Sequence, residues 1–183
     1  IALYPILNNS DAIITLASRR ESHIRTIGYR KPVFRETTTC GFISHKASNQ
    51  TKTKSNYNIL FLSRLLKNKG VYEAIETFKI IKKSYENARL YICGDGAEKE
   101  NVLQLINNQE DVKFFGYIIG EKKEKIFNEC NLFLYPSYED GMPNAVLEAM
   151  AYGLVIVTRD VGGLSDFFIE GHHGYMTKSK SPK

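Results

Sequence analysis

The sequence contains no tryptophan and only three cysteines among its 183 residues. These cysteines (Cys40, Cys93 and Cys130) are odd in number and far apart, so they fit neither a zinc site nor a disulfide framework. We therefore expect a reducing, cytoplasmic setting. No apolar run approaches the roughly 20 residues that a membrane-spanning helix needs. A basic leader with a small-residue cleavage site is also lacking, and the first residue is Ile1 and not Met.

Positive charge is concentrated in the first third of the chain. The net charge is +5, and residues 1–57 hold nine Lys and Arg residues against three Asp and Glu residues. A solvated basic surface is the favoured interpretation, and peripheral contact with anionic lipid headgroups at the inner face of a membrane is the sharper alternative. Nucleic acid is a disfavoured partner, because no basic–aromatic recognition motif accompanies the charge.

Apolar strands alternate with helical patterns after residue 57. The predicted strands are residues 58–63, 88–94, 111–116, 131–136, 154–158 and 174–177. The predicted helices are residues 69–86, 96–108, 120–130, 143–153 and 162–171. In the first of these, helical spacing puts five apolar residues on one face: Val71, Ala74, Ile75, Phe78 and Tyr85. This alternation predicts an α/β fold with a doubly wound, Rossmann-like parallel sheet.

The region before residue 57 follows a different pattern. Residues 11–17 read as a buried strand and residues 18–29 as a helix, with Ser18 as its N-cap and Gly28 near its end. Residues 47–56 are almost entirely polar and are predicted to form a linker.

The first candidate site follows the strand at 131–136. Gly141, Met142, Pro143 and Asn144 open a helix whose first N–H groups point outward, which favours an anion there. Glu148 lies in an otherwise apolar part of that helix and has two interpretations of similar weight. Its carboxylate accepts hydrogen bonds from a sugar diol, or it is a structural carboxylate stabilised by the helix dipole or a neighbouring cation.

A second candidate follows the strand at 58–63. Arg64 stands at the strand end, and Lys69 is predicted at a helix N-terminus, where its charge opposes the helix dipole. Two cations here match the two phosphates of a nucleoside diphosphate, although two surface cations are the plainer interpretation. The pair Gly162-Gly163 and the turn at 94–96 are weaker signals, explained equally well by tight turns.

Together these segments resemble the retaining glycosyltransferases of the GT-B fold. The stretch PSYEDGMPNAVLEAMAYG resembles their donor-site motif, in which two acidic residues are separated by seven. Four further segments agree in the family's order: FLSRLLKNKG, ICGDGAEKE, VKFFGY and TRDVGGLSDFFIEGHHGYM. DAIITLASRR resembles the last strand of the family's first lobe. The likeness covers nearly the whole chain.

The resemblance implies a role for each matching residue. Arg64 and Lys69 would hold the donor diphosphate, and Glu148 would bind the ribose hydroxyls. The loop from Gly141 through Met142 and Pro143 to Asn144 would present N–H groups to the donor sugar and phosphate. Asp140 corresponds to the first acid, which lies near the transferred sugar in the family. Gly116 and Tyr117 would lie beside the nucleotide base. No metal or other cofactor is expected.

The resemblance also implies a domain layout and a function. Residues 1–46 would be the end of an incomplete acceptor-side lobe, 47–56 a linker, and 57–183 the nucleotide-sugar-binding domain without its final C-terminal helix. The favoured function is sugar transfer to a glycan or lipid acceptor bound through the missing lobe. We expect the chain alone to bind nucleotide without transferring sugar. The alternatives are a non-catalytic nucleotide-binding module and a nucleotide-sugar epimerase.

Overall fold

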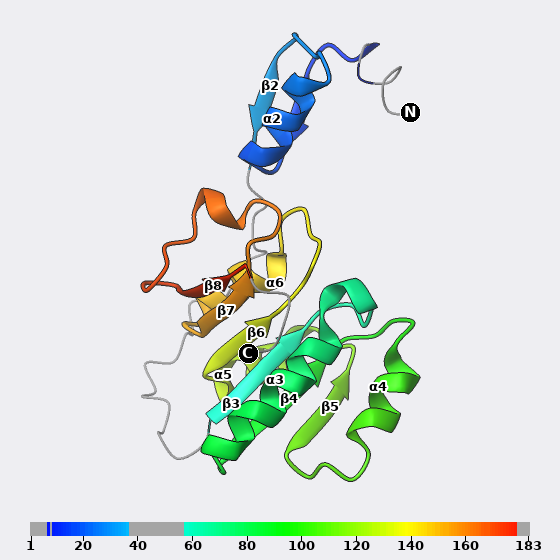
Figure 1. Cartoon of the computed structure of the whole chain (residues 1–183), viewed down its shortest axis with the longest axis vertical. Helices are drawn as coiled ribbons and strands as arrows, with labels where there is room; N and C mark the ends of the chain where they lie inside the picture. Colours follow the sequence, from blue (N-terminus) through cyan, green and yellow to red (C-terminus); the bar gives the residue numbers. More distant parts are fainter. Residues whose placement is uncertain (1–6, 8, 37–56, 179–183) are drawn as a thin grey trace.

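The structure, a computed structural model, describes Leu7, residues 9–36 and residues 57–178. Two separate parallel sheets are present in these regions, one of two strands and one of six (Figure 1). The predicted linker at 47–56 and Cys40 lie outside the described residues.

The larger sheet confirms the predicted architecture. Its strands are β3 (Tyr57–Leu62), β4 (Ala88–Cys93), β5 (Val112–Gly116), β6 (Leu132–Tyr135), β7 (Val155–Arg159) and β8 (Gly174–Thr177). Every neighbouring pair is parallel, and the order is β5-β4-β3-β6-β7-β8. The chain starts in the middle at β3, proceeds to one edge, and returns to β6 on the other side of β3. That reversal is the topological switch point of a doubly wound sheet.

Helices cover both faces of this sheet. The α-helices are α3 (Val71–Ser84), α4 (Lys99–Ile106), α5 (Gly120–Glu129) and α6 (Asn144–Ala151), and two short 3₁₀ helices are η1 (Lys67–Lys69) and η2 (Leu164–Asp166). Neighbouring residues of β3 belong to opposite cores, because strand side chains alternate between faces. Ile59 and Phe61 pack with α3 and α4, whereas Leu60 packs with α5 and α6.

Two predicted helical features are wrong. Tyr85 does not share the buried face of α3, because the helix ends before it; its ring is 51% exposed and packs edge-on against Tyr57. The helix predicted at 162–171 is reduced to η2. The N–H of Ile169 would bond to a carbonyl one turn earlier in a helix, but it donates to Nδ1 of His173 at 3.0 Å. The side chain of a following residue therefore replaces the helical hydrogen bond.

The first part of the chain forms a small β-α-β unit. It consists of β1 (Ile13–Thr15), α2 (Ser18–Thr26) and β2 (Val33–Arg35), and β1 pairs with β2 in parallel. The predicted strand and helix are therefore confirmed, whereas β2 was not predicted. Ser18 is not the N-cap. That position belongs to Ala17, and the Ser18 hydroxyl instead donates to the carboxylate of Asp166 in the larger domain.

Two glycines near β8 offer a test of the packing. Both have positive φ, but a Cβ on Gly174 would lie 1.9 Å from the carbonyl oxygen of Ile156, whereas a Cβ on Gly171 meets nothing within 4 Å. We expect Gly171→Ala to cost about 1–2 kcal/mol for its left-handed backbone. Gly174→Ala should cost more than about 3 kcal/mol, because β8 must also shift from β7. Denaturant unfolding measures both, and equal losses would contradict this packing.

Candidate functional site

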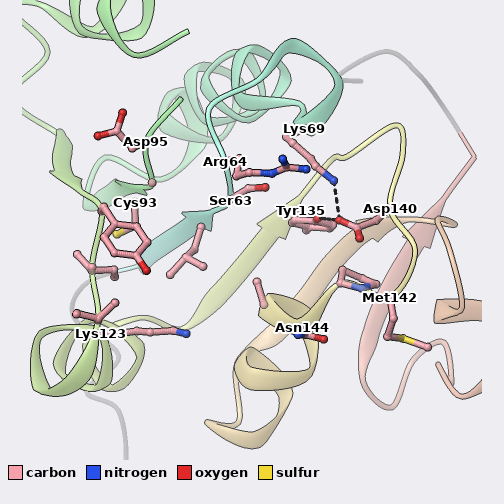
Figure 2. Close-up of a pocket in the computed structure, with 17 residues that line it drawn as sticks. Ser63, Arg64, Lys69, Cys93, Asp95, Lys123, Tyr135, Asp140, Met142 and Asn144 are labelled. Carbon is pink, nitrogen blue, oxygen red and sulfur yellow. Dashed lines mark hydrogen bonds and ion pairs between the residues drawn. The ribbon is translucent and has the colours of Figure 1, made fainter. Parts of the chain in front are cut away.

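A cavity of about 600 Å³ opens at the carboxyl ends of β3, β4 and β6 (Figure 2). This is the switch point of the sheet, where open α/β folds bind their ligands. Its lining comes from the strand ends, the loops that follow them, and α5: Leu62, Ser63, Arg64, Lys69, Cys93, Gly94, Asp95, Tyr117, Ile118, Ile119, Lys123, Tyr135, Asp140, Met142, Pro143, Asn144 and Ala145.

Most of the predicted site residues meet at this cavity. Seven of them line it: Arg64, Lys69, Tyr117, Asp140, Met142, Pro143 and Asn144. Gly116, Gly141 and Glu148 are not among the lining residues. Gly116 and Gly141 instead bond to neighbouring loops through their backbone. The Gly116 carbonyl accepts from the N–H of Gly94 at 2.8 Å, and the Gly141 carbonyl accepts from the N–H of Gly163 at 2.9 Å.

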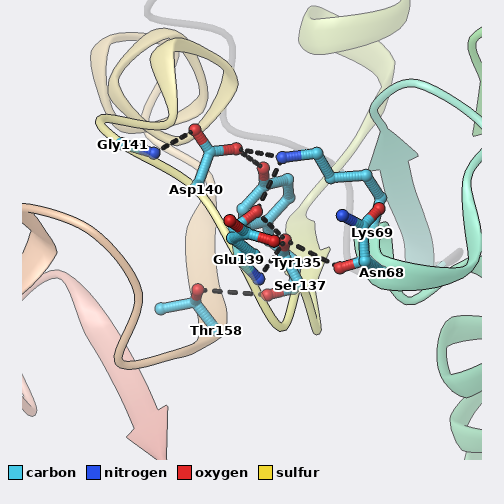
Figure 3. Close-up of polar contacts among 8 residues, drawn as sticks. All are labelled: Asn68, Lys69, Tyr135, Ser137, Glu139, Asp140, Gly141 and Thr158. Atoms are coloured by element: carbon cyan, nitrogen blue, oxygen red, sulfur yellow. Dashed lines mark hydrogen bonds and ion pairs between the residues drawn. The ribbon is translucent and has the colours of Figure 1, made fainter. Parts of the chain in front are cut away.

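The centre of the polar wall is an ion pair between Lys69 and Asp140 (Figure 3). The ammonium group lies 2.7 Å from Oδ2 of Asp140 and also donates to the carbonyl of Glu139 at 2.7 Å. The Tyr135 hydroxyl donates to the same Oδ2 at 2.5 Å. Lys69 does not stand at the start of α3 as predicted. It ends η1, and its side chain is only 8% exposed, because it reaches inward to this carboxylate.

These contacts change the ionisation of Asp140 and Tyr135. Burial by itself would raise the pKa of Asp140, but the hydrogen bonds from Lys69 and Tyr135 outweigh it and hold that pKa below its ordinary value. Burial, reinforced by the neighbouring Asp140 carboxylate, raises the pKa of the Tyr135 hydroxyl far above its ordinary value. The site therefore presents a charged carboxylate and a neutral phenol at neutral pH.

Arg64 is the cation at the cavity whose side chain has no partner among the described residues. Its side chain is exposed, and no hydrogen bond or ion pair to it is found within residues 9–36 and 57–178. The two lining carboxylates already have cations, because Asp140 pairs with Lys69 and Asp95 pairs with Lys99 at 3.0 Å. The Arg64 guanidinium is thus left to attract an anion from solution.

Glu148 is held by a lysine that sequence reasoning did not select. The Nζ atom of Lys123 lies 2.7 Å from Oε1 and 2.6 Å from Oε2 of Glu148, and it lines the cavity next to the carboxylate. The neighbouring cation that the structural interpretation of Glu148 requires is therefore present. It does not exclude a diol ligand, because Glu148 lies directly beside Lys123, which lines the cavity.

Glycines allow the loops around the cavity to pack closely. A Cβ on Gly94 would lie 1.8 Å from the carbonyl oxygen of Ser63, and one on Gly162 would lie 2.0 Å from that of Gly141. Gly162 thus allows close approach to the loop that carries Asp140, whereas a Cβ on Gly163 would meet the Met142 side chain at 2.4 Å and the Leu16 carbonyl oxygen at 2.8 Å.

Several lining residues are not predicted from the sequence. Ile118, Ile119 and Lys123 follow β5, and Tyr135 is the last residue of β6. The rule that ligands meet the ends of parallel strands could have selected Tyr135 and the two isoleucines. Nothing in the lysine-rich segment at 122–125 distinguishes Lys123 from its neighbours.

Within the described part of the chain, no three His, Cys, Asp or Glu side chains gather to hold a metal ion. The expectation that no metal is needed stays a prediction. No helix in the same regions is long and apolar enough to cross a membrane.

Comparison with known proteins assigns the family. Residues 43–183 match the family model described as glycosyl transferases group 1. Because the match covers well over half of the chain, this protein belongs to that family.

Individual relatives are also glycosyltransferases. Over 109 residues the chain is 33% identical to an uncharacterized glycosyltransferase of Methanocaldococcus jannaschii, covering 58% of this chain and 27% of that protein. Over 130 residues it is 28% identical to the capsular polysaccharide biosynthesis glycosyltransferase CapM of Staphylococcus aureus, covering 67% of this chain and 33% of that protein. The chain therefore spans about a third or less of the length of these relatives.

Solved structures share the fold. The pneumococcal O-GlcNAc transferase GtfA, solved in complex with UDP and GlcNAc, superposes with a TM-score of 0.77 at 20% identity, covering 94% of this chain and 35% of that chain. A TarM mutant from S. aureus, solved with UDP among its ligands, gives 0.80 at 19% identity, covering 96% and 35%. Likeness at this identity establishes the fold, which is the Rossmann-like lobe of the GT-B glycosyltransferases.

The Lys69–Asp140 pair predicts a pH-dependent stability. Asp140→Asn should lower the free energy of unfolding by about 1.5–3 kcal/mol at pH 7, because Lys69 loses a charged partner. Since the folded-state pKa of Asp140 is depressed, its contribution is complete above the ordinary value of 3.8 and is lost as the pH falls through the lower folded value. The difference between wild type and variant should therefore be constant near neutrality and shrink below about pH 4.

Urea unfolding between pH 2 and pH 7 measures this difference. The matched control is Asp111→Asn, because Asp111 pairs with Lys82 at 2.7 Å but is 43% exposed. That variant should lose less than about 1 kcal/mol. A gap for Asp140→Asn that stays unchanged down to pH 2 would show that the Asp140 charge does not stabilise the fold.

Proposed function

We propose that the cavity binds a nucleoside-diphospho-sugar and that this chain is the donor-binding lobe of a retaining glycosyltransferase. The observation that carries the proposal is the position of Arg64. It is a cation without a partner among the described residues, at a switch-point cavity that the first turn of α6 also borders. The known binding of UDP by GtfA, a protein with the same fold, supports a nucleotide ligand.

The donor diphosphate is proposed to lie between Arg64, Lys69 and the start of α6. The Lys69 ammonium has three N–H donors, and its contacts with Asp140 and Glu139 occupy two of them. The third can donate to a phosphate while the ion pair stays intact. Met142, Pro143 and Asn144 bring the positive end of the α6 dipole to the same cavity. These groups would stabilise the charge that develops on the leaving diphosphate.

The nucleoside is proposed to lie at the opposite side of the cavity. Figure 2 shows Lys123 across the cavity from the Lys69–Asp140 pair. Glu148 would accept hydrogen bonds from the ribose hydroxyls, and Tyr117, which is 72% exposed, would lie beside the base with Gly116 in the backbone before it. Ile118 and Ile119 supply apolar contact for the base.

Asp140 is proposed to lie near the transferred sugar. Its Oδ1 accepts the N–H of Gly141 at 2.8 Å and its Oδ2 accepts from Lys69 and Tyr135, so the carboxylate is fixed in place. Retention of configuration, a glycan or lipid acceptor, and contact with a membrane surface are proposals for the whole protein. They rest on the family and on relatives such as CapM, whose described role is capsular polysaccharide biosynthesis.

Calorimetric titration with UDP, GDP, ADP and their nucleosides tests the proposed function. We expect at least one diphosphate to bind more tightly than its nucleoside. Arg64→Ala should weaken that diphosphate about tenfold or more, because a charge-assisted hydrogen bond is lost, and should leave the nucleoside almost unaffected.

Lys67→Ala is the matched control. Lys67 is an exposed cation three residues from Arg64 and does not line the cavity, so its loss should change neither affinity appreciably. Equal weakening of diphosphate and nucleoside by Arg64→Ala would contradict the phosphate role. Failure of all three diphosphates to bind the wild type would contradict the proposed function itself.

The ribose contact can be tested separately. Glu148→Gln keeps the shape of the side chain but removes its charge, so nucleotide affinity should fall about tenfold or more. Because the nucleoside carries the same ribose, its affinity should fall by a similar factor. Thermal unfolding provides the control. Unchanged affinity together with a lower melting temperature would show that Glu148 only stabilises the fold.

A further inference from the structure

We propose that Lys123 is a positioning residue that holds the Glu148 carboxylate for a ribose diol and so makes the site select ribonucleotides over 2′-deoxyribonucleotides. This inference rests on the proposed function, because it concerns how the same cavity recognises its nucleoside. It adds a residue from α5 to a site whose other polar groups come from strand ends, the segments that follow them and the start of α6.

The Lys123 ammonium is close to both carboxylate oxygens of Glu148. Nζ of Lys123 lies 2.7 Å from one carboxylate oxygen of Glu148 and 2.6 Å from the other. Lys123 is 29% exposed and Glu148 is 22% exposed, so most of both side chains is shielded from solvent. Nζ also lies 5.9 Å from the ring centroid of Phe127, which belongs to the buried core. The Phe127 ring therefore helps to hold the lysine in place, and the lysine fixes the plane of the Glu148 carboxylate.

A carboxylate bound in this way can still accept a diol. Each oxygen offers about two acceptor positions, and Lys123 occupies one on each. One position on each oxygen is left, which matches the two adjacent hydroxyls of a ribose. Lys123 lines the cavity and contacts Glu148, which is not itself a lining residue, so a ribose at that end of the cavity would reach the remaining positions beside the lysine. The ion pair thus orients the carboxylate as a diol needs it. The acceptor positions that the diol would use stay free.

Neighbouring lysines of α5 are engaged elsewhere. Lys122 donates to the backbone carbonyl of Phe115 at 3.2 Å, and Lys125 stands 4.0 Å from Glu129 on its own helix. Neither lines the cavity. Among the described lysines of this helix, Lys123 is the one that joins α5 to α6 at the site, which makes its neighbour Lys125 a suitable control.

The test compares a ribonucleotide with its 2′-deoxy counterpart on each variant of the 183-residue chain. UDP, GDP, ADP and their counterparts dUDP, dGDP and dADP are each titrated into the protein by calorimetry. The pair whose ribose form binds most tightly to the wild type is then used for the variants. We expect the wild type to prefer the ribose form about tenfold or more. Lys123→Met should reduce that preference to about threefold or less, because the Glu148 carboxylate loses its orientation. Affinity for the deoxy form should barely change.

Two further variants separate positioning from general stability. Lys123→Arg keeps a cation that can contact both carboxylate oxygens, and it should restore most of the ribose preference. Lys125→Met removes a cation of the same helix and should leave the preference unchanged. In the double variant Lys123→Met/Glu148→Gln, the ribose preference should be no lower than in Glu148→Gln alone, because Lys123 acts through Glu148. The preference compares two ligands on one protein, so a smaller folded fraction does not alter it.

Each contrary result has a distinct meaning. Tighter ribonucleotide binding by Lys123→Met would overturn the inference, because it would show that the lysine blocks Glu148. An unchanged ribose preference in that variant would overturn it as well. A wild type that binds diphosphates without preferring ribose would refute the ribose contact but leave the proposed nucleotide site standing. A wild type that binds none of the diphosphates would refute the proposed function and the inference together.

Discussion

The arrangement of the site depends on the position of β3 in the sheet. β3 pairs with β4 on one side and with β6 on the other, so the order in which strands are added to the sheet reverses at β3. Loops leaving β3 and β6 turn toward opposite faces, because α3 packs on one face and α6 on the other. A space is left between these loops at the carboxyl ends of the strands, and the cavity occupies it.

Charge compensation then determines what this cavity can attract. Asp140, Asp95 and Glu148 each have a lysine within 3.0 Å, so their charges are balanced within the protein. Arg64, which has no such carboxylate among the described residues, adds a net positive charge. A low-dielectric wall strengthens this field toward an incoming anion. The balanced pairs have a second effect, because they fix side chains that would otherwise lose rotamer freedom on binding.

The sequence predicts most of the large sheet, because buried parallel strands are continuous apolar runs such as 131–136. It does not reveal β2, whose three residues are all at least partly exposed. The strand-end rule finds Arg64 and the loop at 141–144, since both follow predicted strands directly. It cannot find the Lys69–Asp140 contact, which joins residues 71 positions apart and depends on how two loops fold back on each other.

The loop that carries Asp140 is fixed from both sides. On the cavity side, Lys69 and Tyr135 hold its carboxylate. On the other side, Gly162 lies so close that an added Cβ would meet the Gly141 carbonyl at 2.0 Å, and a Cβ on Gly163 would meet the Leu16 carbonyl at 2.8 Å. The small β-α-β unit therefore packs against Gly163, the neighbour of the glycine that supports the loop. The unit and the Asp140 loop thus meet at two adjacent glycines, and neither close approach leaves room for a side chain there.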